Sequence, residues 1–206
     1  MAALIAMLPL LIFQRRTKKM ASVRTPIGVL CFPVLWTPKP RAQGGEPVYQ
    51  ITLVLDAAAQ KSPQWIECKR SVAEAIDEEF GKGKSADKQF VAGLKMPWRA
   101  CSEKNYDGFD VPGGIFIAPW TKQRPGLVDI KRNEILVPED VWAGMLCRAT
   151  IAPFAYQQSG NKGVNFALNN VQICGKGERR LDGRKPAKED FPDDQQTEDE
   201  DADVPF

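Results

Sequence analysis

Short runs rich in apolar, β-branched and aromatic residues recur along the chain, and glycine, proline or asparagine separates them. This pattern is typical of β-strands joined by turns and loops. The runs occupy residues 29–36, 48–55, 115–120, 145–154 and 164–173. Two glycines and an asparagine lie in the link between the last two runs, so we expect these runs to pair as an antiparallel hairpin.

One segment has the apolar spacing of a helix. Ser62 and Pro63 supply a cap and a first-turn proline, and apolar residues then recur at helical spacing up to Gly81. The pattern therefore predicts one helix over residues 63–80. Residues 82–110 show no consistent period, and we expect loops and short elements there.

Five strands, one helix and loops of unequal length predict a mainly β fold, an OB-type five-stranded barrel with extra loops, although other small barrels fit the same counts. We expect this domain to cover residues 20–181, because the apolar periodicity ends there. The apolar segment 1–13 is shorter than the roughly 20 residues that a membrane-spanning helix needs. We interpret residues 1–19 as an N-terminal extension, with Met1 and Met20 as alternative starts.

Charge divides the chain into a basic body and an acidic tail. Nine of the 26 acidic residues lie after Lys188, where there is no lysine or arginine, so the preceding residues carry a net charge of +11. A run of carboxylates loses its hydration in a packed core, and we expect residues 182–206 to form a disordered, solvated tail. The basic body favours a polyanion such as nucleic acid, and the tail can compete for the same surface.

The composition excludes several kinds of site. The chain has no histidine, and its five cysteines are scattered without a C-x-x-C pair. These facts argue against a Cys/His zinc site, a disulfide framework and histidine-based nucleophilic catalysis. We expect reduced thiols, no metal, no cofactor and no enzymatic activity.

Aromatic and basic residues alternate in several of the predicted strands and loops. Unpaired bases stack on exposed rings and neighbouring cations follow the phosphates, so this pattern is typical of single-stranded nucleic-acid binding. The predicted DNA-binding residues are Lys95, Trp98, Arg99, Lys104, Tyr106, Trp120, Lys122, Arg124, Tyr156 and Lys162. Four other aromatic residues are assigned to the core, namely Trp65, Trp142, Phe154 and Phe166.

Other motifs support alternative functions only weakly. Residues 81–85 resemble the end of a phosphate-binding loop but lack its first glycine, and residues 104–108 resemble a nucleotidyltransferase motif with one extra residue. A metal-dependent nuclease would have to use aspartates without recognisable spacing, namely Asp87, Asp107, Asp110 and Asp129. RNA remains an alternative ligand, because stacking and phosphate contacts do not distinguish the sugars.

Residues 121–129, 142–144 and 163–172 resemble segments of the bacteriophage single-stranded DNA-binding proteins. The ending D-A-D-V-P-F is similar to the acidic Pro-Phe tip of the bacterial single-stranded DNA-binding proteins, with Ala202 and Val204 as departures. The resemblance implies an OB-fold protein that coats single-stranded DNA during phage replication, recombination and repair in the cytoplasm of the infected bacterial host.

The tail, in this family, would recruit a DNA polymerase, helicase or nuclease. The departures at the tip favour a phage-encoded partner, and no membrane is implied. The tail residues expected to bind the partner are Asp199, Glu200, Asp201, Asp203, Val204, Pro205 and Phe206. The sequence leaves open whether the protein forms a homo-oligomer.

Overall fold

The computed structural model describes residues 21–41, 44–158, 160–181 and 183. The N-terminal extension predicted over residues 1–19 lies outside these residues. So does the predicted tail, apart from Gly183. The boundaries of both segments therefore stay predictions.

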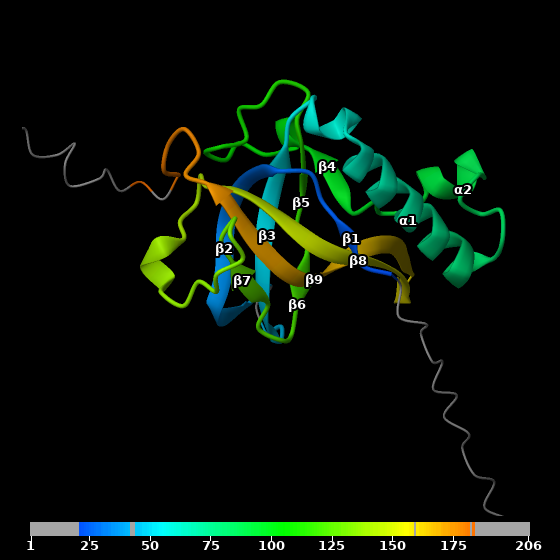
Figure 1. Ribbon diagram of the computed structural model, residues 1–206. Coiled ribbons are helices and arrows are strands. Elements are labelled where there is room, and N and C mark those ends of the chain that lie inside the picture. Colours follow the sequence, from blue (N-terminus) through cyan, green and yellow to red (C-terminus); the bar gives the residue numbers. More distant parts are fainter. Residues whose placement is uncertain (1–20, 42–43, 159, 182, 184–206) are drawn as a thin grey trace, which may run out of the picture.

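Five strands pair in a closed ring and form a small β-barrel (Figure 1). In order around the ring they are β2 (Gly28–Pro40), β3 (Pro47–Leu55), β6 (Trp120–Thr121), β9 (Asn161–Gly175) and β8 (Leu146–Gln158), and β8 pairs back with β2. Every pairing is antiparallel except that of β6 with β9. This order confirms the mainly β, OB-type barrel predicted from the sequence.

The hairpin predicted from the last two apolar runs is confirmed as β8 and β9. The two strands pair from Leu146 opposite Gly175 to Gln158 opposite Asn161. Both strands run further toward the tip than their apolar residues do, because the backbone ladder continues through polar residues. Gly160 has a φ of 78° at the turn, which suits glycine.

Four short strands extend the ring. They are β1 (Val23–Arg24), which pairs with β8; β4 (Trp98–Ala100) and β5 (Ile115–Ile117), which pair with each other; and β7 (Gly126–Val128), which lies parallel to β9. The strand predicted over residues 115–120 is divided into β5 and β6. Pro119 lies at the division, where it lacks the N–H of a ladder residue but accepts a hydrogen bond from the Ile51 amide at 3.3 Å.

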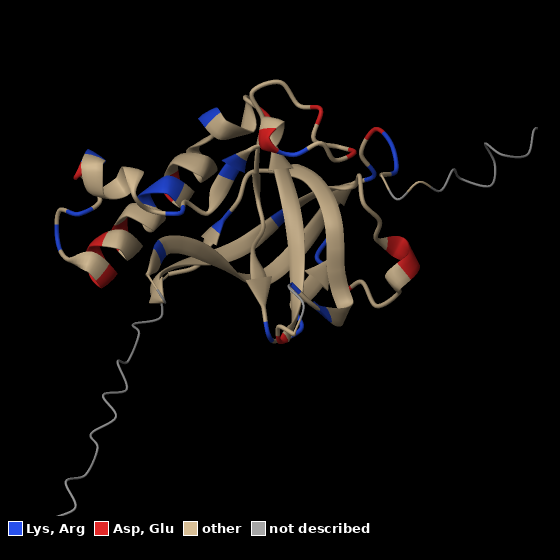
Figure 2. Cartoon of the chain, turned by 180° about the vertical axis from the view of Figure 1, so that it is seen from behind, with Lys and Arg blue, Asp and Glu red and all other residues tan. Residues whose placement is uncertain are grey.

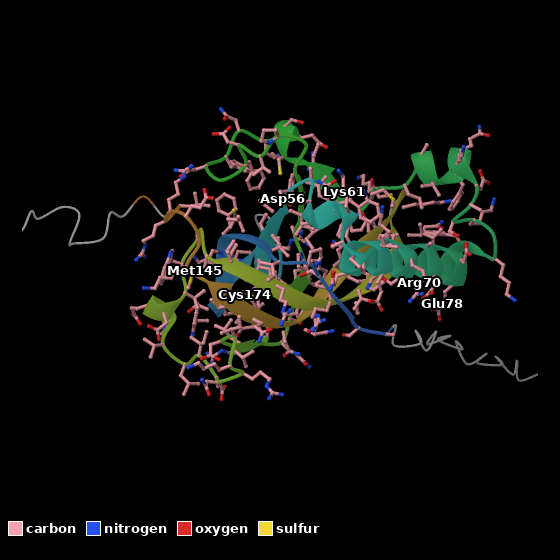
Figure 3. All side chains as sticks on the ribbon, turned by 45° about the horizontal axis from the view of Figure 1, so that its top comes forward. Asp56, Lys61, Arg70, Glu78, Met145 and Cys174 are labelled. Carbon is pink, nitrogen blue, oxygen red and sulfur yellow. The ribbon has the colours of Figure 1, made fainter. Side chains whose placement is uncertain are left out.

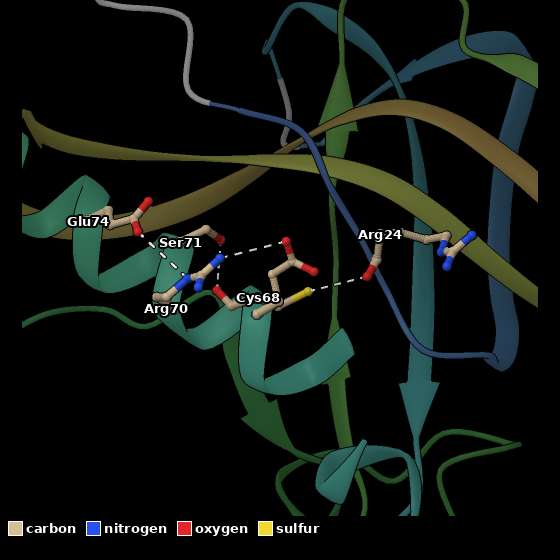
Figure 4. A network of polar contacts seen from close by, with 6 residues as sticks. Arg24, Cys68, Arg70, Ser71 and Glu74 are labelled. Carbon is tan, nitrogen blue, oxygen red and sulfur yellow. Dashed lines mark hydrogen bonds and ion pairs between the residues drawn. The ribbon is translucent and has the colours of Figure 1, made fainter. Parts of the chain in front are cut away.

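The predicted helix is confirmed as α1 (Pro63–Phe80). The Ser62 hydroxyl accepts a hydrogen bond from the Trp65 amide, and the helix ends at Gly81, whose φ is 110°. The buried stripe of α1 lies against the strands, and the Cys68 thiol contacts the Arg24 carbonyl of β1 at 3.9 Å (Figure 4). Arg70 and Glu78 project from its outer surface (Figure 3).

The segment predicted to form loops also contains a short second helix. This helix is α2 (Lys88–Ala92), capped by Asp87, and its Phe90 ring meets Phe80 edge-on at 5.3 Å. Three single-turn 3₁₀ helices complete the fold: η1 (Ala59–Lys61), η2 (Cys101–Glu103) and η3 (Pro138–Asp140). A helix as short as α2 lacks the repeated apolar spacing by which sequence patterns are recognised.

The barrel interior is filled by alternate residues of the ring strands. On β3 the inward residues are Ile51, Leu53 and Leu55, and they pack with Phe166 of β9. The core assignments of Phe166 and Trp65 are confirmed, since both are buried. Trp142 is half-buried and packs against the core from its edge.

All five cysteines are free, as expected for reduced thiols, and four of them are buried. Burial raises the pKa of the Cys31 and Cys68 thiols to about 12. Because the thiolate is the reactive form, these two side chains act as small apolar residues in the folded protein.

Candidate nucleic-acid interface

One row of side chains crosses four neighbouring strands of the barrel. Residues directly opposite each other in paired strands project from the same face. The row, which we call the outer row, consists of Gln50 (β3), Trp120 (β6), Ala167 (β9) and Ala152 (β8). Phe166 and Leu168, the neighbours of Ala167 along β9, point into the core, so the outer row points away from it.

Phe154 lies beside the outer row and not in the core, so its core assignment is wrong. Pro153 lies opposite the inward Phe166, and Phe154 lies opposite Asn165 on the outer side. The rings of Phe154 and Trp120 meet edge-on, with centroids 6.0 Å apart. The alternation of β8 is apolar on both faces here, and a sequence pattern alone does not show which face is inside.

Trp120 is also covered by a cation that the sequence prediction did not include. The guanidinium of Arg41, from the loop between β2 and β3, lies 5.5 Å from the centre of the Trp120 ring. Partial desolvation lowers the pKa of Arg41, and the neighbouring Tyr156 opposes that shift. The basic, glycine-rich composition of this loop was the available sequence signal. The Trp120 indole N–H has no acceptor among the described residues.

The structure brings three predicted residues together at the tip of the β8–β9 hairpin. The Lys95 amide donates to the Lys162 carbonyl at 3.0 Å, and the Lys95 ammonium donates to the Asn161 side chain at 2.6 Å. A β-carbon added to Gly163 would lie 2.5 Å from the Lys95 carbonyl and 2.9 Å from the Tyr156 hydroxyl. The close approach of Lys95, Lys162 and Tyr156 therefore requires glycine at this position.

Lys122 and Arg124 lie in the loop that follows β6, and both are exposed. Lys122 forms an ion pair with Glu46, which belongs to the loop between β2 and β3. Both side chains of this pair are largely exposed, so the ion pair contributes little to stability. Its two partners are free to exchange each other for solvent or for a ligand.

The other four predicted residues lie on β4 and the segment after it. Trp98 is half-buried and meets Trp65 of α1 edge-on at 5.5 Å, a packing contact. Arg99 forms an ion pair with Glu103 at 2.7 Å. Lys104 lies over the exposed ring of Tyr106, 5.9 Å from its centre. The predicted residues thus divide into a group around the outer row and a group beside β4.

Acidic residues are absent from the five ring strands. None of β2, β3, β6, β8 and β9 contains an aspartate or a glutamate within its bounds. Acidic side chains gather instead on the helical segments and on loops at the edge of the molecule (Figure 2). A polyanion on the barrel wall therefore meets few fixed negative charges.

A separate basic cleft of about 340 Å³ lies further along the β8–β9 hairpin. It is lined by Arg24, Val128, Ile130, Arg132, Arg148, Ala149, Thr150, Asn170, Val171 and Gln172. Arg148 donates to the Gln172 side chain at 2.8 Å. These arginines come from three distant segments, and sequence spacing gave no signal that they meet.

The alternative enzymatic motifs are not assembled into a site. Among the described residues, no three or more histidine, cysteine, aspartate or glutamate side chains form a group able to hold a metal ion. Asp87 caps α2, Asp107 pairs with Arg179, and Asp129 binds the Asn133 amide. In the segment that resembles a phosphate loop, the Ser85 amide donates to the Asp77 carboxylate at 2.7 Å, so a carboxylate already occupies the amide.

Within the same described residues, no helix is both long and apolar enough to cross a membrane.

Comparisons with known proteins agree with this fold. The family described as "Enterobacter phage Enc34, ssDNA-binding protein" matches residues 21–203. The structure of the single-stranded DNA-binding protein from bacteriophage Enc34 in complex with ssDNA is similar at a TM-score of 0.59 and 19% identity, and the match covers 77% of this chain and 88% of that one.

A C-terminal truncation of the same bacteriophage Enc34 protein gives a TM-score of 0.60 at 20% identity, over 75% of this chain and 86% of that one. At such identities the likeness to these structures establishes the fold alone. No curated protein matches the sequence.

Proposed function

Since the chain belongs to the family of the Enterobacter phage Enc34 ssDNA-binding protein, we propose that it binds single-stranded DNA through the outer row and the loops around it. The observation that carries this proposal is the position of Trp120. Its ring lies on an outer barrel face without carboxylates, with Arg41 above it and Phe154 beside it. In OB domains the corresponding strands and loops bind oligonucleotides.

Two kinds of contact provide the binding. Bases stack on Trp120, Phe154 and Tyr156, and each stacked base contributes about 1 to 3 kcal/mol. Phosphates lie near cations of the surrounding loops, which are Arg41, Lys95, Lys122, Arg124 and Lys162. A base of any kind presents a face for stacking, so the binding does not select sequence.

The remaining predicted contacts extend this proposal. Arg99, Lys104 and Tyr106 would meet DNA that continues past the outer row toward β4, whereas Trp98 supports the fold through Trp65. The function is non-catalytic and is performed in the cytoplasm of the infected host, during replication, recombination or repair of phage DNA. The acidic tail, residues 182–206, recruits a partner enzyme through its terminal Pro205 and Phe206.

The proposal is tested by fluorescence anisotropy with labelled single-stranded, double-stranded and RNA oligonucleotides of the same length at several salt concentrations. We expect the tightest binding to single-stranded DNA and a fall in log affinity of about 0.7 per log unit of salt for each neutralised phosphate. A flat salt response or a preference for duplex would contradict the proposal. Tighter binding of oligo-U than of oligo-dT would support the RNA alternative.

A further inference from the structure

Phe32 has a backbone conformation that residues other than glycine rarely adopt. Its φ is 46°, in the left-handed region. The pairs that flank it are Cys31 with Thr52 and Val34 with Gln50. Between these pairs β2 has two residues where β3 has one, which makes a β-bulge. The left-handed position of such a bulge is normally filled by glycine, and a phenylalanine is strained there.

The strained conformation places a large apolar ring on the surface. Phe32 is 48% exposed and meets Tyr106, which is 49% exposed, edge-on at a centroid distance of 5.4 Å. The Phe32 ring also contacts Phe109 at 6.3 Å. Two neighbouring aromatic rings that each expose half of their surface do not serve the core. Strain of this kind is typical of functional positions.

The ring pair lies on the same side of the barrel as the outer row. Phe109 packs with Cys31 and Val54, and Val54 faces outward because Leu53 and Leu55 point into the core. Thr52, opposite Cys31, is two residues along β3 from Gln50 of the outer row. Two residues of a strand span about 7 Å. The two aromatic sites are therefore close neighbours on one face.

The charge around the ring pair suits a phosphate backbone. The Lys104 ammonium lies 5.9 Å from the centre of the Tyr106 ring. Asp107, the residue after Tyr106, is paired with Arg179 at 2.5 Å, so a cation already accompanies this carboxylate. A base on the rings would thus have a cation beside it for its phosphate.

We propose that Phe32 and Tyr106 form an additional base-stacking site, which lengthens the stretch of single-stranded DNA held by each molecule. This inference rests on the proposed function. The bulge in β2 is the device that turns Phe32 outward, and the proposal assigns a role to a residue outside the aromatic and basic pattern of the sequence.

The experiment compares Phe32→Gly, Phe32→Trp and Tyr106→Ala with the unchanged protein. Binding is measured by anisotropy on oligo-dT of about 4 and about 16 nucleotides, which bracket the site sizes of single OB domains. Thermal unfolding is measured for each variant. Leu136→Ala is the control, because Leu136 is an apolar residue 66% exposed on the loop between β7 and β8.

We expect Phe32→Gly to unfold at the same temperature as the unchanged protein or higher, because glycine adopts the left-handed conformation without strain. The same variant should bind the long oligonucleotide roughly tenfold more weakly, with a smaller loss on the short one. Tyr106→Ala should behave alike in binding, whereas Phe32→Trp and Leu136→Ala should bind like the unchanged protein.

Equal binding of the long oligonucleotide by Phe32→Gly and the unchanged protein would overturn this inference and leave the proposed function intact. A lowered unfolding temperature with unchanged affinity would assign Phe32 to packing alone, against the proposal. Failure of the unchanged protein to bind either oligonucleotide would instead overturn the proposed function itself.

Discussion

Trp120 joins the fold to the candidate interface. Its backbone pairs with Gln50 on one side and Ala167 on the other, which fixes the ring on the outside of the barrel. The small side chains of Ala167 and Ala152 leave space beside the ring, and Phe154 limits it at the far edge. A half-buried indole with an unpartnered N–H is well suited to a ligand that offers both a flat face and an acceptor.

At the residue scale, we expect Trp120→Ala to weaken single-stranded DNA binding by about 1 to 3 kcal/mol, the contribution of one stacked base. Trp120→Phe should keep most of the affinity but abolish most of the quenching of tryptophan fluorescence by DNA. Anisotropy and fluorescence titrations measure the two effects. Trp142→Phe is the matched control, since Trp142 lies against the core edge and should leave both readouts unchanged. Full quenching in Trp120→Phe would place the bases elsewhere.

At the scale of elements, the tip of the β8–β9 hairpin is held by the segment that precedes β4. Lys95 forms a parallel bridge with Gly163, and its carbonyl accepts a hydrogen bond from the Val164 amide at 2.9 Å. This contact joins residues far apart in the chain. It keeps Tyr156 and Lys162 next to Lys95, so the hairpin tip is a fixed part of the interface.

We expect Gly163→Ala to destabilise the protein by about 1 to 3 kcal/mol, the usual cost of overpacking, because the added β-carbon overlaps the Lys95 carbonyl. It should also weaken DNA binding, because Lys95 and Tyr156 are displaced. Gly93→Ala is the control, since its β-carbon would come no closer than 3.4 Å to the Phe90 carbonyl. Thermal unfolding and anisotropy measure both effects, and equal behaviour of the two variants would argue against a tight contact at Gly163.

The elements most accessible to sequence reasoning were those with their own local signals. The cap at Ser62 and the apolar spacing after it define α1, and the β-branched runs define β2, β3, β8 and β9. The misassigned Phe154 shows the limit, because a strand that is apolar on both faces does not reveal its inner side. Arg41 and Phe32 were missed because a ring contact and a bulge are set by the partner strand, which local patterns do not specify.

At the scale of the whole molecule, the charge distribution separates a receptive surface from a rival for it. The ring strands lack acidic residues, and nine acids follow Lys188. A tethered polyanion and a DNA strand would meet the same basic surface. Their competition would be electrostatic and would therefore weaken as salt screens both.

Removal of residues 193–206 deletes seven of those nine acids. We expect tighter binding of single-stranded DNA at low salt, with the difference lost at high salt, and loss of partner recruitment. A variant of full length with Asn and Gln in place of these acids but with Pro205 and Phe206 retained is the control. It should match the truncation in DNA affinity, measured by anisotropy. Looser DNA binding in either variant would contradict the competition.

The closure of the barrel has a mechanical consequence. Between β6 and β9 the ladder consists of one pair, Trp120 with Ala167, whereas β8 and β9 pair along their whole length. The ring is thus weakest at the seam where its main candidate stacking residue lies. A strand of DNA resting across that seam would act as a clasp, so that grip on the ligand and resistance of the barrel to opening would rise together.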